Sequence, residues 1–234
     1  MAFRSQTTTL VVLIASAFIA RAEDLSFPAR HDHVRKGGEG TLTFTEELVR
    51  WEEPKKPEHS HTWRYAEIQR LELAPGRVRI VSYDDARWQL GRDREYLFDQ
   101  LPAELALRVH PFLTERLDQR YLAHVADRSA MPTWAVPAKL LIGRGGSNGD
   151  LKFFDGQIMF DGGERGESRT WKWSDITNVN SSDPFELTLT TIEGENRLQL
   201  KAALPEDRYQ ELWRSIAQSH GLKVFQSSAV HEHK

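Results

Sequence analysis

Hydrophobic and polar residues alternate along a stretch near the start of the chain. In GTLTFTEELVRW, residues 40–51, Leu42, Phe44, Val49 and Trp51 alternate with polar residues. A period of two is typical of strands that bury one face. The polar run TEE separates the two alternating segments. The stretch therefore predicts a β-hairpin.

A second stretch repeats this pattern at a spacing of 109 residues. It is GDLKFFDGQIMF, residues 149–160, in which FDG takes the place of the turn. The alignment pairs Leu42 with Leu151, Phe44 with Phe153, Val49 with Ile158 and Trp51 with Phe160. Internal repeats decide the architecture of a chain. We therefore interpret the chain as two copies of one unit.

The repeat continues in HTWRYAEI (residues 61–68) and RTWKWSDI (residues 169–176), which are identical or chemically similar at most positions. Each segment has two aromatic residues at i and i+2, on one face of a strand. The following isoleucine has the opposite parity, so we expect a bend or bulge before Ile68 and Ile176. We interpret the aromatic residues as core, with a stacking groove for a peptide or sugar as the alternative. They are Trp63, Tyr65, Trp171 and Trp173.

Each copy closes with Leu-Pro followed by a helical pattern, at residues 101–102 and 204–205. In the second copy, one apolar helix face is formed by Tyr209, Leu212, Trp213 and Ile216. In the first copy, Pro111 predicts a kink or a break, because proline clashes with the preceding turn of a helix. We expect residues 112–125 to continue as a helix toward the second copy.

This order of elements resembles the pleckstrin-homology-like superfold, and is most similar to its GRAM and bacterial branches. The resemblance rests on G-x-L-x-F before the hairpin and W-x-[YW]-x-[ED]-I after it. It implies a mainly β fold with α-helices, made of two tandem bent antiparallel sandwiches, each closed by a C-terminal helix. It also implies a role in binding lipids or peptides, although a fold alone does not fix a function.

The repeat and the resemblance together predict five segments. They are a signal peptide (1–22), a first pleckstrin-homology-like domain (23–111), a helical linker (112–133), a second such domain (134–222) and a flexible polar tail (223–234).

The first residues have the composition of an export signal. Arg4 precedes the apolar run LVVLIASAFIA, and small residues stand at Ala20 and Ala22. The run is too short to span a bilayer, so we expect cleavage after Ala22 rather than an anchor. The sequence therefore predicts an exported protein, periplasmic or secreted, that is not an integral membrane protein after cleavage.

The net charge and the lack of cysteine argue against a nucleic-acid partner and against sites built on thiols. Loss of Arg4 and Arg21 would leave 31 − 2 = 29 basic against 34 acidic residues. A net acidic chain argues against a nucleic-acid partner, whose binding surface should be basic. The chain has no cysteine, which excludes disulfides, a thiol nucleophile and thiolate metal ligands.

Histidine pairs of the form His-x-His are candidate metal ligands. In the first copy they are His31 with His33 and His59 with His61. Residues at i and i+2 of a strand project to one side, so the two pairs could share Zn²⁺ or Cu²⁺. The alternative is that they are ordinary strand and loop residues and that the protein has no cofactor.

Basic residues around the first hairpin of each copy form a second candidate site. They are Arg30, Arg35 and Lys36 in the first copy, and Lys139 and Arg144 in the second. The resemblance implies that an anionic lipid head group could bind at these positions. The run GRGGSNG, residues 143–149, is predicted to be a hairpin turn, because a phosphate loop would precede a helix and carry Lys-Ser or Lys-Thr.

No catalytic motif supports an enzyme: the chain lacks H-E-x-x-H and a cysteine nucleophile. The sequence therefore predicts an exported, non-catalytic binding or scaffolding protein whose partner is a peptide or protein. Divalent-metal binding through the histidine pairs and anionic-lipid binding through the basic loops are the two alternatives.

Overall fold

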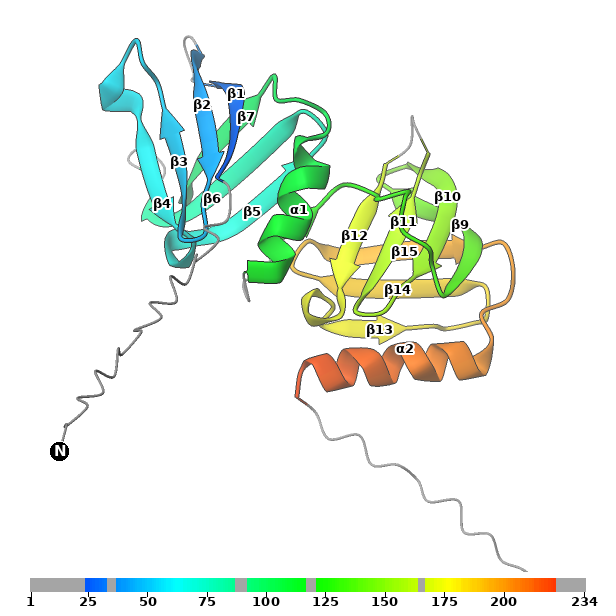
Figure 1. The fold of residues 1–234 in the computed structure, drawn as a ribbon. Helices are drawn as coiled ribbons and strands as arrows, with labels where there is room; N and C mark the ends of the chain where they lie inside the picture. Colours follow the sequence, from blue (N-terminus) through cyan, green and yellow to red (C-terminus); the bar gives the residue numbers. More distant parts are fainter. Residues whose placement is uncertain (1–23, 33–36, 87–91, 117–120, 164–166, 222–234) are drawn as a thin grey trace, which may run out of the picture.

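The fold is described from a computed structural model, which covers residues 24–32, 37–86, 92–116, 121–163 and 167–221. Within these residues the protein is mainly β, with two α-helices, and its strands join into one continuous sheet. The sheet runs in the order β13-β14-β15-β9-β10-β11-β12-β8-β5-β6-β7-β1-β2-β3-β4 (Figure 1).

Residues 24–116, the N-terminal half, contain strands that end in a helix. They are β1 (Leu25–His31), β2 (Gly38–Phe44), β3 (Leu48–Glu52), β4 (His61–Arg64), β5 (Ile68–Ala74), β6 (Arg77–Asp85), β7 (Asp93–Asp99) and α1 (Leu105–Arg116). Short 3₁₀ turns occur at η1 (Pro57–His59) and η2 (Tyr65–Glu67).

Residues 134–221, the C-terminal half, follow the same succession. They contain β9 (Trp134–Ile142), β10 (Gly145–Phe153), β11 (Gln157–Asp161), β12 (Arg169–Lys172), β13 (Asn178–Asn180), β14 (Glu186–Thr191), β15 (Gly194–Leu200) and α2 (Glu206–Ser219). The 3₁₀ turn η3 (Trp173–Asp175) stands where η2 stands in the other half.

The hairpins predicted from the alternating pattern are confirmed in both halves. Phe44 pairs with Val49 across β2 and β3, and Phe153 pairs with Ile158 across β10 and β11. The expected bends before Ile68 and Ile176 are the turns η2 and η3. In each turn a carboxylate accepts a hydrogen bond from a backbone N–H at the turn's start: Glu67 from Arg64, and Asp175 from Lys172.

The hairpin turn predicted at the glycine-rich run, residues 143–149, is confined to its first two residues, and residues 145–149 belong to β10. Ile142 pairs with Gly145, so Gly143 and Arg144 alone connect β9 to β10. Gly143 has φ +55, a left-handed conformation that glycine adopts without steric cost.

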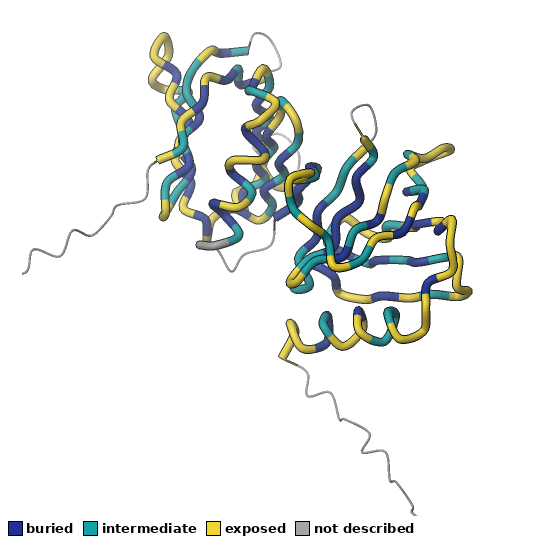
Figure 2. Tube along the Cα trace, turned by 45° about the vertical axis from the view of Figure 1, so that its right-hand side comes forward, coloured by how far each residue is buried: buried dark blue, intermediate teal, exposed yellow. Residues whose placement is uncertain are grey.

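Each half has its own cluster of buried apolar side chains. Trp51 and Phe160, which occupy equivalent positions in the repeat, are both fully buried. Trp63, Tyr65 and Trp171 are buried as well, which confirms that they are core residues. The burial pattern alternates along the strands, and α2 buries one side and exposes the other (Figure 2).

The first helix differs from expectation in two respects. A kink or a break was predicted at Pro111, and the break is ruled out, because the chain keeps helical geometry through this residue. Val109 and Leu113 on either side are fully buried, and their packing holds the helix together across the hydrogen bond that proline removes.

The expected helix over residues 112–125 ends at Arg116, and Leu122–Ala123 forms a strand, β8. The part of the predicted helical linker from residue 121 to 133 is thus a short strand followed by irregular chain. The reason is tertiary: β8 supplies backbone partners to the edges of both halves. Leu122 pairs in parallel with Glu72 of β5, and Ala123 pairs with Leu73 of β5 and with Thr170 of β12.

Candidate functional site

A hollow that both halves line lies beside β8. This inter-half groove has a volume of ≈ 710 Å³. It is lined by Glu72, Ala74, Pro75, Arg77, Ala103, Glu104, Leu107, His124, Val125, Ala126, Arg128, Gly163, Glu167 and Ser168. Its walls therefore combine apolar side chains with charges of both signs.

The strand β8 places His124 at this groove. The backbone N–H of His124 donates to the carbonyl of Leu73 at 2.8 Å, which extends the pairing with β5 by one residue. On the other side, the Thr170 hydroxyl donates to the carbonyl of Val125 at 2.7 Å. The chain is thus held between β5 and β12 at this point, and the imidazole is positioned by backbone contacts to both halves.

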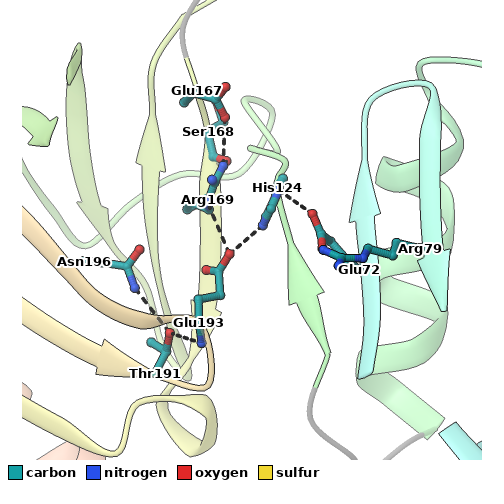
Figure 3. A network of polar contacts seen from close by, with 9 residues as sticks. All are labelled: Glu72, Arg79, His124, Glu167, Ser168, Arg169, Thr191, Glu193 and Asn196. Atoms are coloured by element: carbon teal, nitrogen blue, oxygen red, sulfur yellow. Dashed lines mark hydrogen bonds and ion pairs between the residues drawn. The ribbon is translucent and has the colours of Figure 1, made fainter. Parts of the chain in front are cut away.

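His124 lies between two carboxylates, one from each half (Figure 3). Its Nε2 is 2.7 Å from Oε1 of Glu193, in the turn between β14 and β15. Its Nδ1 is 3.4 Å from Oε1 of Glu72, on β5. The three side chains are only 15–20% exposed. Because each ring nitrogen faces a protein carboxylate, the arrangement suits a tie between the halves better than proton transfer to a substrate.

The contacts extend into a chain of alternating charge, drawn in part in Figure 3. On the N-terminal side, Arg79 lies 3.5 Å from Glu72 and 2.7 Å from Glu95. On the C-terminal side, Arg169 lies 3.8 Å from Glu193 and 3.0 Å from Glu167. The order is Glu95, Arg79, Glu72, His124, Glu193, Arg169, Glu167. Each basic group therefore stands between two acids, across both halves.

The charges of this chain shift the pKa of Glu193. Burial alone would raise the pKa of its carboxyl, but the hydrogen bond from His124 and the positive charges of His124 and Arg169 outweigh it. The pKa consequently lies below its ordinary value. The pKa of Arg79 is shifted upward, because its hydrogen bond to Glu95 stabilises the charged guanidinium despite burial.

A second ion cluster supports the C-terminal wall of the groove. Oδ2 of Asp161 accepts from Nζ of Lys152 at 2.9 Å, and its Oδ1 accepts from Nε of Arg128 at 3.1 Å. The N–H of Gly163 also donates to Oδ1, at 3.0 Å. Burial opposes ionisation of Asp161, but these donors together lower the pKa of its carboxyl. Arg128, half of whose side chain is exposed, is thereby fixed at the groove wall.

The apolar part of the groove comes mainly from the start of α1 and the linker. Leu107 is 43% exposed there, although it is a large apolar residue. A groove of this volume lies within the range of about 300–1,000 Å³ that is usual for ligand sites, and such sites occur preferentially between domains.

The structure places the candidate metal ligands apart from this groove, in the N-terminal half. His31 is buried, with its ring stacked on Phe98 at 4.9 Å between centroids. His61 contacts the ring of Tyr96 at 5.0 Å, and Nδ1 of His59 lies 3.5 Å from Oε2 of Glu53. His33 lies outside the described residues. Among the residues that the structure describes, no three or more His, Asp or Glu side chains are grouped to hold a metal ion.

The candidate anion-binding residues belong to two separate hairpins. Arg30 is half-buried on β1, Lys139 is half-buried on β9, and Arg144 is exposed in the β9–β10 turn. Arg35 and Lys36 lie outside the described residues. The structure therefore brings none of the described basic residues of one hairpin to those of the other.

Sequence reasoning missed the residues that tie the halves together. Glu72, His124 and Glu193 are far apart in the sequence, and His124 lay in a segment predicted to be helical. The available signal was a histidine inside the otherwise apolar run YLAHV, residues 121–125, where a polar side chain requires partners.

No helix in the described part of the chain is long and apolar enough to cross a membrane.

Comparisons with known proteins add little to this geometry. No family model matches the chain, and no curated protein matches it. Among solved structures, the one described as "Structure of the Spt16D Pob3N heterodimer" is similar with a TM-score of 0.32 and 14% sequence identity. The match covers 73% of this chain and 84% of that chain. A similarity of this size carries no argument about fold or function.

Proposed function

We propose that this protein is an exported, non-catalytic binding or scaffolding protein made of two tandem pleckstrin-homology-like modules, and that a peptide or protein segment docks in the inter-half groove. The repeated order of elements, with a 3₁₀ turn at the same place and a closing helix in each half, supports the two modules. The groove that both halves line is the observation that carries the binding role.

The chemistry of the groove favours a peptide over a small anion or a metal ion. Its lining includes the acids Glu72, Glu104 and Glu167 and the bases Arg77, Arg128 and His124. Charges of both signs around an apolar strip of side chains suit a chain segment that carries its own apolar anchor and mixed charges. A polyanionic ligand would meet three carboxylates in the same groove.

The pairing of β8 gives this groove a fixed shape. The halves on either side of it share one continuous sheet, and the ion pairs of His124 hold β5 and the β14–β15 turn together. A preformed groove costs less ordering when a peptide binds. The proposed role is therefore that of a rigid unit whose docking site requires both modules at once.

The test is site-specific photocrosslinking with the mature chain, residues 23–234. Benzoylphenylalanine at position 107 reports on the groove, and the same residue at position 185 is the matched control. Phe185 is 52% exposed and lies outside the groove lining. In the native envelope or medium, we expect a defined protein adduct from position 107 and a weaker one from position 185. Equal labelling at both positions, or none at either, would contradict the proposal.

A second measurement quantifies the site once a partner segment has been recovered. Leu107→Asp places a charge on the apolar strip, and we expect it to raise the Kd at least about tenfold. Because Leu107 is partly exposed, the variant should fold, which its circular dichroism spectrum would check. An unchanged Kd with a folded variant would move the docking site elsewhere.

A further inference from the structure

A smaller hollow lies at the opposite end of the C-terminal half, between the start of β9, the β10–β11 turn and α2. This aromatic hollow has a volume of ≈ 310 Å³. It is lined by Thr133, Trp134, Phe153, Phe154, Asp155, Trp173, Arg208, Glu211 and Ser215. Among described residues it shares no lining residue with the inter-half groove, so it is an independent site.

Four of its lining side chains are aromatic, and the backbone fixes where they stand. Trp134 and Phe153 are register partners on β9 and β10, with ring centroids 4.7 Å apart at an angle of 45°. The N–H of Phe154 donates to Gln157 at 3.0 Å, which closes the hairpin turn. The N–H of Trp173 donates to the carbonyl of Gly156 at 3.0 Å. The rings are therefore set by strand pairing and by a tight turn rather than by a loose loop.

The charged lining of the hollow is net negative. Asp155 is exposed in the turn, and Glu211 lies on α2 with its side chain 64% exposed. Among the described lining residues Arg208 is the single basic side chain, and it is already paired with Glu211 at 2.8 Å. Two carboxylates against one guanidinium leave one negative charge, next to four rings whose faces are themselves electron-rich.

The equivalent corner of the N-terminal half is built differently. At a spacing of 109 residues, the equivalent of Trp134 is Leu25 and the equivalent of Phe154 is Thr45. Tyr65 is buried there, and its hydroxyl donates to the carbonyl of Thr45 at 2.9 Å. Trp173, at the matching point of the other half, is only partly buried. Two of the four lining rings, Trp134 and Phe154, therefore have no aromatic counterpart in the other copy.

From these observations we propose that the aromatic hollow binds a quaternary ammonium group, such as that of choline. A quaternary ammonium has no N–H to donate, so it is recognised by aromatic ring faces together with nearby negative charge. The hollow supplies four aromatic side chains and two carboxylates. Its volume is at the lower end of the range for ligand sites, which fits a small head group better than a peptide segment.

The test is a competition between two ligands of the same shape. Choline and 3,3-dimethylbutan-1-ol both present three methyl groups on a central atom, but only choline is charged. In saturation-transfer NMR with the mature chain, the methyl signal of each reports its binding. We expect choline to be preferred by about fivefold or more.

Two variants locate the binding and keep the result interpretable. Asp155→Asn removes one surface charge, so it should not disturb folding, and we expect it to weaken choline binding by about threefold or more. The matched control is Glu46→Gln, the equivalent position of the other copy, which should leave binding unchanged. Trp173→Leu should abolish the signal, with the circular dichroism spectrum confirming that it folds.

The outcomes separate the alternatives. Equal binding of the neutral isostere would show that the hollow is merely apolar and would overturn the proposal. The proposal would also be overturned if neither free choline nor phosphatidylcholine vesicles bound. Flotation with phosphatidylcholine vesicles then identifies the source of the head group. Binding to vesicles that depends on Asp155, without binding of free choline, would assign a lipid head group. Binding of free choline alone would assign a soluble ligand.

Discussion

The two closing helices, α1 and α2, begin alike and end in different surroundings. Each follows a buried leucine and a proline, Leu101-Pro102 and Leu204-Pro205. At the same spacing of 103 residues, Leu113 corresponds to Ile216, and both are buried. The two helices therefore share this core-facing position.

The outward positions differ because α1 lies between the halves, whereas α2 turns that side to solvent (Figure 1). His110 of α1 corresponds at that spacing to Trp213 of α2. His110 lines a hollow of ≈ 190 Å³ that includes Met159 and Thr170 of the other half. Trp213 is 45% exposed. The repeat therefore determines what each helix packs against in its own half. The position of each copy in the chain determines whether the outward face of its helix is covered by another half.

The largest effect is expected where the helices are equivalent. Leu113→Ala and Ile216→Ala each remove a buried side chain, which typically costs about 2–5 kcal/mol of unfolding free energy. Urea denaturation of each variant would measure it. Leu107→Ala, at a partly exposed position of α1, is the control and should cost less than about 1 kcal/mol. A small cost at Leu113 would show that α1 is not anchored in its own half as the structure indicates.

The next effect concerns pH and belongs to α1 alone. The pKa of His110 is lowered to about 4, mainly by burial and also by the charge of Lys172, while Asp127 opposes the shift. Because the folded value lies below the ordinary value of about 6.5, the unfolded chain takes up the proton first. Titration of His110 therefore lowers the free energy of unfolding by up to about 3 kcal/mol as pH falls from about 6.5 to about 4.

Urea denaturation at pH 7 and at pH 4.5 measures this pH dependence. His110→Gln should flatten the loss of stability over that interval. The lowered pKa values of Asp161 and Glu193 act in a different window, because their contribution is present above the unfolded carboxyl pKa and is lost only as pH falls further, through the folded values. An identical pH slope in His110→Gln and the natural chain would assign the effect to other groups.

A smaller effect is expected from the tie between the halves. Glu193→Gln removes the charge that faces Nε2 of His124 at 2.7 Å, and charge-assisted hydrogen bonds typically contribute about 1.5–3 kcal/mol. The loss should shrink in 0.5 M salt only slightly, because these side chains are mostly buried. Urea denaturation in low and high salt measures both quantities.

The control for that tie is an exposed pair. Glu39 and Lys55 are 3.2 Å apart with about three quarters or more of each side chain exposed. Glu39→Gln should therefore change the unfolding free energy by less than about 0.5 kcal/mol. An equally small change for Glu193→Gln would mean that β8 alone, without its charges, joins the halves.

The hairpins and their turns could be predicted from the sequence because they depend on local periodicity. Leu42 and Phe44 alternate with polar residues whatever packs above them, and the same alternation recurs in the second copy. The linker could not be predicted in this way. Leu122–Ala123 forms a strand because β5 and β12 both offer an edge there, and those partners lie about 50 residues away on either side.

The candidate site could not be predicted from the sequence for a related reason. Six of the nine histidines stand in conspicuous His-x-His pairs, whereas His124 stands by itself. Its importance comes from Glu72 and Glu193, which only the folded chain brings to its two ring nitrogens. Short-range motifs point to residues that are neighbours in sequence, and a groove between two halves is built from residues that are not.

The smallest expected effect tests the exposed side of α2. Trp213→Gln replaces a side chain that is 45% exposed, and surface substitutions usually change stability by about 0.5 kcal/mol or less. Thermal unfolding of the variant at two protein concentrations measures this. A loss well above 1 kcal/mol that grows with protein concentration would show that Trp213 is covered by a second copy in solution. In that case α2, like α1, would have another half packed against its back, and the difference between the two helices would vanish.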